Sequence, residues 1–297
     1  MNRIKDQIRC GAAYRLGLTG KGIGVAVLDT GIFLHRDFDS RVTGFADMVN
    51  GKNFAYDDCG HGTHICGIIG GSGRMSGGRY SGIAPGCDLV MVKVLDRKGN
   101  GYSSDVLAGI SWILERKEKL GIRILNISVG ACSKRGMSEN SALVKGVNRA
   151  WDAGLVVVVA AGNNGPRTMS ITTPGISRKV ITVGCSDDDR EVLVGGNRMV
   201  DYSGRGPTAA CICKPDLVAP GCSVVSCSSR ADKYTIKSGT SMSTPIVSGA
   251  VALLLERFPD MTNKDVKLRL RESSVDIGLP RNQQGWGLLD VGKMIGK

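Results

Sequence analysis

The sequence predicts an α/β protein: a three-layer arrangement in which helices cover both faces of a mainly parallel central sheet. Short runs rich in Val, Ile and Leu recur along the chain, and each is followed by a glycine-containing turn and a helical pattern. Runs that are apolar at nearly every position are typical of strands buried on both faces. Alternation of strand, helix and strand favours right-handed crossovers and a parallel sheet. No repeat or linker-like stretch divides the 297 residues, so one domain spanning residues 1–297 is expected.

Five strands and three helices follow from these patterns. The strands are predicted at residues 24–30, 87–96, 122–130, 154–163 and 179–187, and the helices at residues 103–121, 138–154 and 262–274. A further helix is expected after Gly239, because small hydroxyl residues precede an apolar run there. In a sheet of this kind, reactive groups are expected at the carboxyl ends of the strands.

Composition excludes several classes of protein. The formal net charge is +12, but Lys and Arg are dispersed and aromatic residues make up 5%, so no nucleic-acid partner is expected. No run approaches the roughly 20 apolar residues of a membrane span, so no membrane partner is expected either. The charged amino terminus lacks the apolar stretch of a signal peptide. We therefore expect a cytoplasmic protein without a prodomain; secretion would require this chain to be a processed or truncated form.

Ten cysteines are scattered along the chain, and free thiols are the simplest interpretation. Residues 211, 213, 222 and 227 form the one cysteine cluster that hints at metal binding, without the usual paired spacing. Cys59 and Cys66 flank His61 in sequence. Their simpler role is as small buried residues; the alternative is that mercurials or thiol oxidants inhibit the protein through one of them.

Two segments could supply a carboxylate and a base. Asp29 closes the first apolar strand, in VAVLDTGI, where a carboxylate is partly removed from water and needs a partner. Alternatively, Asp29 caps the following turn. His61 and His64 lie in HGTHICGIIGG. On a helix, this i, i+3 pair could bind a metal, although no third ligand is evident.

A third segment, SGTSMSTPIVSGAVALL, could supply a nucleophile. Ser241 follows a glycine-permitted turn and lies at the positive end of a helix dipole, which stabilises developing negative charge. Pro245 lacks the N–H that would bond to the Ser241 carbonyl, so the start of the helix is locally altered. The alternative is that these hydroxyl residues, Thr240, Ser243 and Thr244 among them, cap the helix.

Together, Asp29, His61 and Ser241 provide an orienting carboxylate, a general base and a nucleophile, in the chain order found in subtilisin. The three segments resemble the three signature blocks of the subtilisin-like serine proteases, and the resemblance extends from about Gly11 to the terminal GWGLLDVGKMI. It implies the subtilisin-like three-layer fold and a serine endopeptidase that forms an acyl-enzyme at Ser241, acts broadly on peptides or unfolded proteins, and requires no cofactor for its chemistry. The sequence indicates no particular oligomeric state.

The same resemblance implies further site residues. Asn163, directly after Ala-Ala-Gly, corresponds to the side chain that donates to the oxyanion. The expected substrate contacts are the segment Ser128, Val129 and Gly130, the opposite edge formed by Gly99, Asn100 and Gly101, and the neighbouring Ala161 and Gly162. Ala131 replaces a glycine that the family usually has, which is expected to narrow the entrance of the specificity pocket.

A structural calcium is a further implication of the resemblance. Asp37 resembles a calcium-binding aspartate of many family members, but loop 71–82 lacks an asparagine-type ligand and contains two arginines. No metal is therefore assigned at Asp37, and the acidic residues 187–189 are an alternative cation site or a solvated turn.

Two alternatives to a broad endopeptidase stay open. One is a pseudoenzyme that uses its cleft to hold a peptide, against which the complete triad and Asn163 argue. The other is a processing protease that matures a single peptide.

Overall fold

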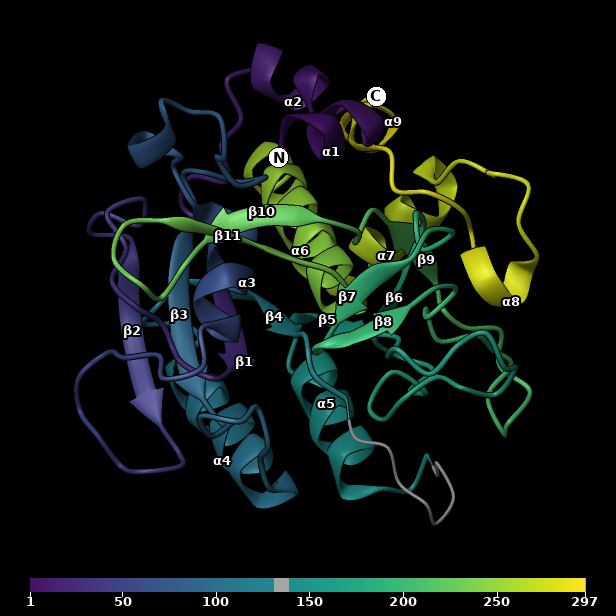
Figure 1. Ribbon diagram of the computed structural model, residues 1–297, viewed down its shortest axis with the longest axis horizontal. Helices are drawn as coiled ribbons and strands as arrows, with labels where there is room; N and C mark the ends of the chain where they lie inside the picture. The colour runs from purple at the N-terminus through teal and green to yellow at the C-terminus, as the bar shows by residue number, and fades with distance from the viewer. Residues whose placement is uncertain (131–138, 297) are drawn as a thin grey trace.

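The computed structural model describes residues 1–130 and 139–296, and its centre is a seven-stranded sheet (Figure 1). The strand order is β2-β3-β1-β4-β5-β6-β9, and every neighbouring pair is parallel. The strands of this sheet are β1 (Gly24–Asp29), β2 (Val42–Asp47), β3 (Asp88–Lys93), β4 (Ile122–Ile127), β5 (Val156–Ala160), β6 (Ile181–Cys185) and β9 (Leu217–Ala219). The predicted mainly parallel α/β architecture is confirmed.

Two antiparallel ribbons and a set of helices complete the described part of the chain. The ribbons pair β7 (Val192–Val194) with β8 (Asn197–Met199), and β10 (Val224–Cys227) with β11 (Tyr234–Lys237). The helices are α1 (Asn2–Gln7), α2 (Gly11–Arg15), α3 (His61–Gly70), a short 3-10 helix (Arg74–Ser76), α4 (Ser103–Arg116), α5 (Ala142–Asp152), α6 (Thr240–Arg257), α7 (Asn263–Ser273), α8 (Arg281–Gln284) and α9 (Val291–Ile295). Within this part of the chain, none of the helices has the length and apolar character needed to cross a bilayer.

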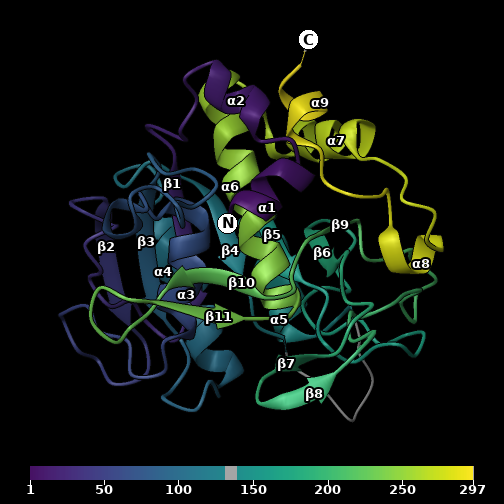
Figure 2. The same cartoon turned by 45° about the horizontal axis from the view of Figure 1, so that its top comes forward.

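Helices cover both faces of the sheet, as predicted. Successive side chains of a strand point to opposite faces. In β3, Met91 lies against Gly62 of α3, whereas the next residue, Val92, lies against Gly109 of α4. The long helix α6 packs beside α3, and α5 packs beside α4. Figure 2 also shows α2 and α9, from the two ends of the chain, side by side near one end of α6.

The predicted strands and helices are found at the expected places, with shorter bounds. Two sheet strands were missed. The edge strand β2, VTGFAD, is only partly buried and lacks a continuous apolar run. The other edge strand, β9, has three residues. Neither has the long apolar run by which the five buried strands were recognised.

The strand order places three polar segments at one edge of the sheet. Asp29 ends β1, Ser128 follows β4, and Asn163 follows β5. Because β1, β4 and β5 are adjacent and parallel, their carboxyl ends meet. The sheet therefore assembles the candidate site from residues far apart in sequence.

Candidate active site

Asp29 and His61 form a close, partly buried pair. His61 Nδ1 lies 2.8 Å from Oδ1 and 2.9 Å from Oδ2 of Asp29. Asp29 is fully buried, whereas 23% of the His61 side chain is exposed. A carboxylate at Nδ1 selects the tautomer that holds its proton there, which leaves Nε2 as a base. Asp29 Oδ1 also accepts the Thr30 N–H at 2.7 Å, so the turn-capping alternative is correct as well.

Two glycines allow His61 to start α3 directly against the end of β1. Gly60 has φ = 87°, a conformation that side chains with a Cβ rarely adopt. A Cβ on Gly62 would lie 2.2 Å from the carbonyl oxygen of Gly31. Gly60 is thus required by its left-handed backbone, and Gly62 by the close approach of two backbones.

His64 does not share a site with His61. It is fully buried, and its Nε2 lies 3.1 Å from the Val224 carbonyl and 3.2 Å from the Thr235 carbonyl. Burial lowers the pKa of His64 to about 3, so this imidazole is neutral. The metal-binding alternative for the histidine pair is therefore wrong.

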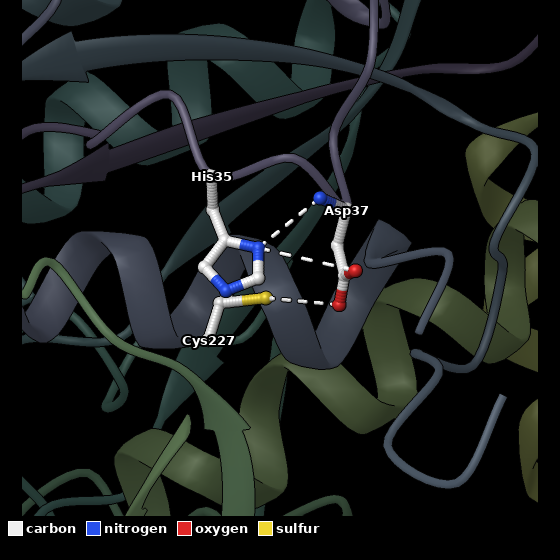
Figure 3. Close-up of side chains that lie close together, drawn as sticks. All are labelled: His35, Asp37 and Cys227. Atoms are coloured by element: carbon white, nitrogen blue, oxygen red, sulfur yellow. Dashed lines mark hydrogen bonds and ion pairs between the residues drawn. The ribbon is translucent and has the colours of Figure 1, made fainter. Parts of the chain in front are cut away.

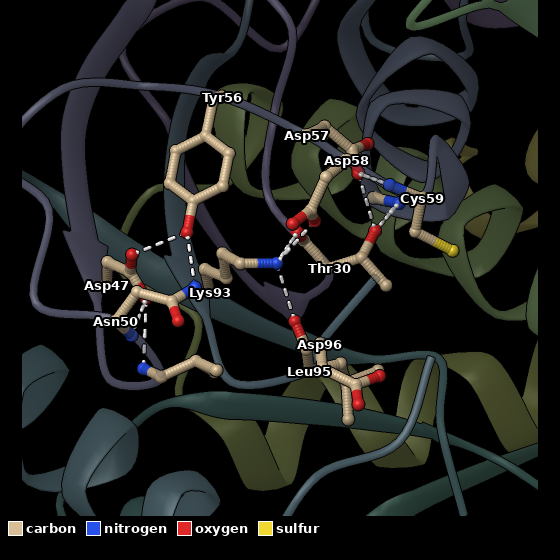
Figure 4. Close-up of polar contacts among 12 residues, drawn as sticks. Thr30, Asp47, Asn50, Tyr56, Asp57, Asp58, Cys59, Lys93, Leu95 and Asp96 are labelled. Carbon is tan, nitrogen blue, oxygen red and sulfur yellow. Dashed lines mark hydrogen bonds and ion pairs between the residues drawn. The ribbon is translucent and has the colours of Figure 1, made fainter. Parts of the chain in front are cut away.

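Asp57 fastens the segments that supply Asp29 and His61 to each other (Figure 4). Its Oδ1 accepts the Thr30 hydroxyl at 2.9 Å and two backbone N–H groups just before α3. Its Oδ2 accepts the N–H of Thr63 at 2.9 Å and the hydroxyl of Thr63 at 2.6 Å. One carboxylate thus holds the turn after Asp29 and the first turn of α3.

Lys93 supports the same turn from the neighbouring strand (Figure 4). It is fully buried, and it lies opposite Asp29 in the register of β1 and β3. Its Nζ donates to the carbonyl oxygens of Thr30 at 2.6 Å and Leu95 at 2.7 Å, and to Asp58 Oδ1 at 2.8 Å. These three acceptors compensate the cost of removing the ammonium from water.

Sequence reasoning identified neither Asp57 nor Lys93. Two signals were present: a lysine ends an otherwise apolar strand, and an aspartate precedes the glycine-rich start of α3. Both signals indicate a buried charge that needs partners. Neither signal names those partners, because the partners come from other segments.

Ser241 is the second residue of α6, in the turn whose N–H groups have no acceptor within the helix. Its Oγ donates to the carbonyl oxygen of Ser128 at 2.6 Å. Pro245 lies inside the first turns of α6, as expected. The serine therefore lies at the carboxyl edge of the sheet, near the end of β4.

The hydroxyl residues around Ser241 do not cap α6, and the capping interpretation is wrong. The N-cap residue is Gly239, which has no side chain. Ser243 donates its hydroxyl to the Ala219 carbonyl at 2.8 Å, and Thr244 donates to the Thr240 carbonyl at 2.8 Å. The cap comes instead from Asn163, whose Oδ1 accepts both the N–H and the hydroxyl of Thr240, each at 3.0 Å.

This contact also orients the Asn163 amide. With Oδ1 committed to Thr240, Nδ2 is the end left to donate. Asn163 borders the same cleft as His61 and Ser241. The arrangement can therefore present a side-chain N–H next to the Ser241 N–H, as two donors to one oxygen.

The cleft has a volume of about 460 Å³ and contains most of the expected substrate contacts. It is lined by Thr30, Cys59, His61, Leu95, Lys98, Gly99, Ser128, Val129, Gly130, Ala160, Gly162, Asn163, Asn164, Thr172, Gly195, Lys237, Thr240 and Ser241. A neighbouring cavity of about 220 Å³ is shared by the two expected edges, because Asn100 and Gly101 line it together with Val129 and Gly130. The two edges thus face a common space.

Ala161 is fully buried, and its backbone N–H and carbonyl pair with Val183 and Thr172. Its neighbours Ala160 and Gly162 line the cleft, so we expect them to contact the substrate in its place. Ala131 and its predicted effect on the pocket entrance lie outside the described residues.

Comparison with known proteins agrees with this geometry. The profile of the subtilase family matches residues 20–287. The chain belongs to the subtilase family. It is 43% identical over 290 residues to serine protease AprX of Bacillus subtilis (strain 168). The match covers 92% of this chain and 65% of AprX, so this chain spans a little under two thirds of the length of AprX. It is 34% identical to subtilisin Savinase of Lederbergia lenta, covering 96% of this chain and 95% of that protein.

Solved structures of subtilases have the same fold. Sphericase is 31% identical and superposes with a TM-score of 0.77, covering 92% of this chain and 93% of that chain. A cold-adapted subtilisin-like serine proteinase is 29% identical, with a TM-score of 0.75, covering 92% and 90%. This subtilase chain is thus similar over most of its length to named subtilisin-like serine proteases, which are hydrolases.

Asp37 does not fit the calcium site that some subtilases have. Its Oδ1 accepts the Met75 N–H at 2.9 Å, and its Oδ2 accepts the Tyr234 hydroxyl at 2.7 Å. The other groups facing this carboxylate are the His35 imidazole, 3.9 Å away, and the Cys227 thiol, 3.7 Å away (Figure 3). Calcium prefers six to eight oxygen ligands, whereas this carboxylate is flanked by nitrogen and sulfur.

The other candidate cation sites are rearranged by the fold. Asp187 and Asp188 are buried, and Asp188 Oδ2 accepts the N–H of Ser203 at 2.7 Å, so residues 187–189 do not form an exposed acidic cluster. Cys211 and Cys213 are exposed, whereas Cys222 is buried beside Cys185. The cysteine cluster inferred from sequence spacing is therefore wrong.

Proposed function

We propose that this subtilase is an endopeptidase in which Ser241 is the nucleophile, His61 the general base and Asp29 the orienting carboxylate. The observation that supports this assignment most directly is the Asp29–His61 contact beside a cleft that Ser241 also borders. Asp29 fixes the proton on Nδ1, and Nε2 takes the Ser241 proton as Oγ attacks a peptide carbonyl.

The remaining steps use groups that line the same cleft. The Asn163 amide and the Ser241 N–H donate to the oxyanion that forms on the attacked carbonyl. His61 then returns the proton to the leaving amine, and water hydrolyses the acyl-enzyme by the same base. The proposed chemistry uses side chains, backbone N–H groups and water.

The substrate is proposed to be an extended peptide or an unfolded segment of protein. Residues 99–101 and 128–130 offer two backbone edges between which a third strand can pair. Pairing through backbone groups tolerates many side chains, which favours broad specificity. The 220 Å³ cavity, lined by Leu95, Val106 and Ile127 among others, suits an apolar side chain of the bound peptide.

Labelling with a fluorophosphonate tests this proposal. The natural chain should form a covalent adduct, detected as a mass increase, and Ser241→Ala should form none. Ser238→Ala is the matched control, because Ser238 accepts the Ser223 N–H and should not affect labelling. A natural chain that is folded but unlabelled at neutral to alkaline pH would favour the pseudoenzyme.

Cleavage of a random peptide library tests the breadth of specificity. Cuts at many unrelated sequences, with enrichment of apolar side chains on the acyl side, are the expected result. Cuts confined to one sequence would support the processing protease instead.

A further inference from the structure

Two cysteines that are distant in sequence face each other beside the loop that leads to Ser241. Cys185 ends β6, and Cys222 lies between β9 and β10. The Tyr202 hydroxyl lies 3.2 Å from Cys185 Sγ and 3.1 Å from Cys222 Sγ, while Asp187 Oδ1 lies 3.3 Å from Cys185 Sγ. All four side chains are buried. The fold thus encloses two sulfurs and two oxygens in one small space.

The spacing of these atoms suits a tetrahedral cation. One ligand atom each from Cys185, Asp187 and Cys222 lies within 4.8 Å of the other two. With Zn–S bonds of about 2.3 Å and Zn–O bonds of about 2.0–2.2 Å, tetrahedral ligand atoms are separated by roughly 3.3–3.8 Å. Small side-chain movements would bring the sulfurs and the carboxylate to these separations.

The carboxylate is already held in place by contacts of the kind that orient metal ligands. Asp187 Oδ1 accepts the N–H groups of Gly221 at 2.7 Å and Cys222 at 3.0 Å. Asp187 Oδ2 pairs with Arg3 at 3.0 Å. Such outer contacts fix a ligand before the ion arrives.

The charges also balance. Cysteine binds a metal ion as the thiolate. A divalent cation would displace one proton from each of the two thiols. The two thiolates and the Asp187 carboxylate then carry three negative charges, against two on the ion and one on Arg3.

We propose that Cys185, Asp187 and Cys222, with the Tyr202 hydroxyl at the fourth position, bind one thiophilic divalent cation of the zinc class. Thiolate ligands select zinc and softer ions over calcium and magnesium. The site is distinct from the catalytic groups, and the inference does not rest on the proposed activity. A bound ion would also help to hold the residues before Ser241. Gly221 precedes the ligand Cys222, and its carbonyl accepts the N–H of Gly239 at 3.0 Å, two residues before Ser241.

Cadmium titration tests the site directly. The metal-free protein is prepared in a background in which the other thiols that could bind the ion are each changed to Ser: Cys59, Cys132, Cys211, Cys213 and Cys227. Cys227 is included because it forms a second possible ligand cluster with His35 and Asp37. Cadmium–thiolate bonds give a charge-transfer absorption in the ultraviolet, and we expect this band to saturate at one Cd²⁺ per chain with release of two protons. A folded chain that gives no such band overturns the proposal.

Variants locate the ion. In the same background, Cys222→Ser should lose most of the band, whereas Cys87→Ser, which removes a buried thiol in the main core, should keep it. Zn²⁺ at 100 times its dissociation constant should raise the Tm of the background chain by roughly 5 °C, and that of Cys222→Ser by little.

Equal shifts in both chains, or an undiminished band in Cys222→Ser, contradict the assignment. If Cys222→Ser does not fold, the stoichiometry and proton release of the background chain still decide the question. A disulfide between Cys185 and Cys222, detected as a mass lower by two hydrogens, also overturns the proposal if the chain binds no cation after the disulfide is reduced.

Discussion

The Ser241 hydroxyl donates its hydrogen bond to the carbonyl oxygen of Ser128, 2.6 Å away, and not to His61. Among the residues that the structure describes, no hydrogen bond joins Ser241 and His61. Ser241 Oγ must therefore rotate toward Nε2 before His61 can accept its proton, a rearrangement that catalytic groups often make when substrate binds. Ser128 lies on an edge that is proposed to pair with the peptide. Substrate binding is therefore expected to free the Ser241 hydroxyl from the Ser128 carbonyl.

Acid should stop the reaction, because a protonated His61 cannot accept the Ser241 proton. We expect kcat/KM to fall about tenfold for each pH unit on the acid side of the profile. The measurement uses a chromogenic peptide at constant ionic strength, with circular dichroism to confirm the fold. Rates that stay level into acid, while the fold persists, would exclude His61 as the base.

Asp29→Asn should lower kcat by on the order of 10³–10⁴-fold with little change in KM, because an amide no longer fixes the required histidine tautomer. Steady-state kinetics on a peptide substrate measure both constants. Asp189→Asn is the control, since Asp189 is exposed and its nearest cation, Arg190, is 3.8 Å away. Similar kcat values for the two variants would refute the role assigned to Asp29.

Two substitutions of Asn163 should separate its two roles. Asn163→Asp keeps an oxygen for the Thr240 N–H but loses the Nδ2 donor, whereas Asn163→Ala loses both. Both variants should lower kcat by about 10²–10³-fold, and Asn163→Ala should also lower the unfolding free energy by about 1 kcal/mol through the lost cap. Kinetics and urea unfolding of the same samples provide the comparison. Normal kcat in Asn163→Asp would remove this residue from the oxyanion site.

His64 should make the fold sensitive to acid. Its pKa is about 3 in the folded chain, against an ordinary value of 6.5, because burial disfavours the charged ring. Among the described residues, its Nδ1 also has no hydrogen-bond partner. Between these two pH values the unfolded chain binds a proton that the folded chain does not, so the unfolding free energy falls as the pH falls.

The His64→Gln variant measures this contribution. Between pH 6.5 and 4.5, the natural chain should lose roughly 2 kcal/mol more unfolding free energy than the variant. Urea unfolding at both pH values gives the difference directly. The same loss in both chains would show that His64 is not the responsible group.

Mercurials should inhibit through Cys59 rather than Cys66. Cys59 is partly exposed and borders the cleft, whereas Cys66 is fully buried in α3. Burial raises the pKa of the Cys59 thiol, so alkylating agents should react slowly at neutral pH while mercurials still bind. Cys59→Ser should resist inhibition, and Cys213→Ser, which removes an exposed thiol elsewhere, should not. Full activity after complete mercuration of Cys59 would end this hypothesis.

Much of the site could be predicted because its chemistry is local in sequence. VAVLDTGI, HGTHICGIIGG and the segment around Ser241 each place a reactive residue beside the glycines or apolar residues that its backbone needs. The close approach of Gly62 to Gly31 shows why: a Cβ at this position would collide with the turn that holds Asp29. Such steric requirements leave a readable pattern in each segment.

The failed predictions concern partners rather than residue types. The alternative interpretation of the hydroxyls near Ser241 was that they cap α6, yet the cap is Asn163, which follows β5. Cys222 was grouped with cysteines near it in sequence, but it lies beside Cys185. Asp57 and Lys93 were missed because their acceptors and donors belong to other segments.

The sequence by itself determined the buried parallel strands and the family, and it predicted the three residues that are proposed to react, since apolar runs and backbone constraints are properties of short segments. The tertiary structure decided which groups meet: Lys93 under the Asp29 turn, Asn163 on the first turn of α6, and two thiols around Tyr202. The physical reason is that a buried polar group must find a partner wherever the folded chain brings one near. The order of strands in the sheet determines that partner, and distance along the chain does not.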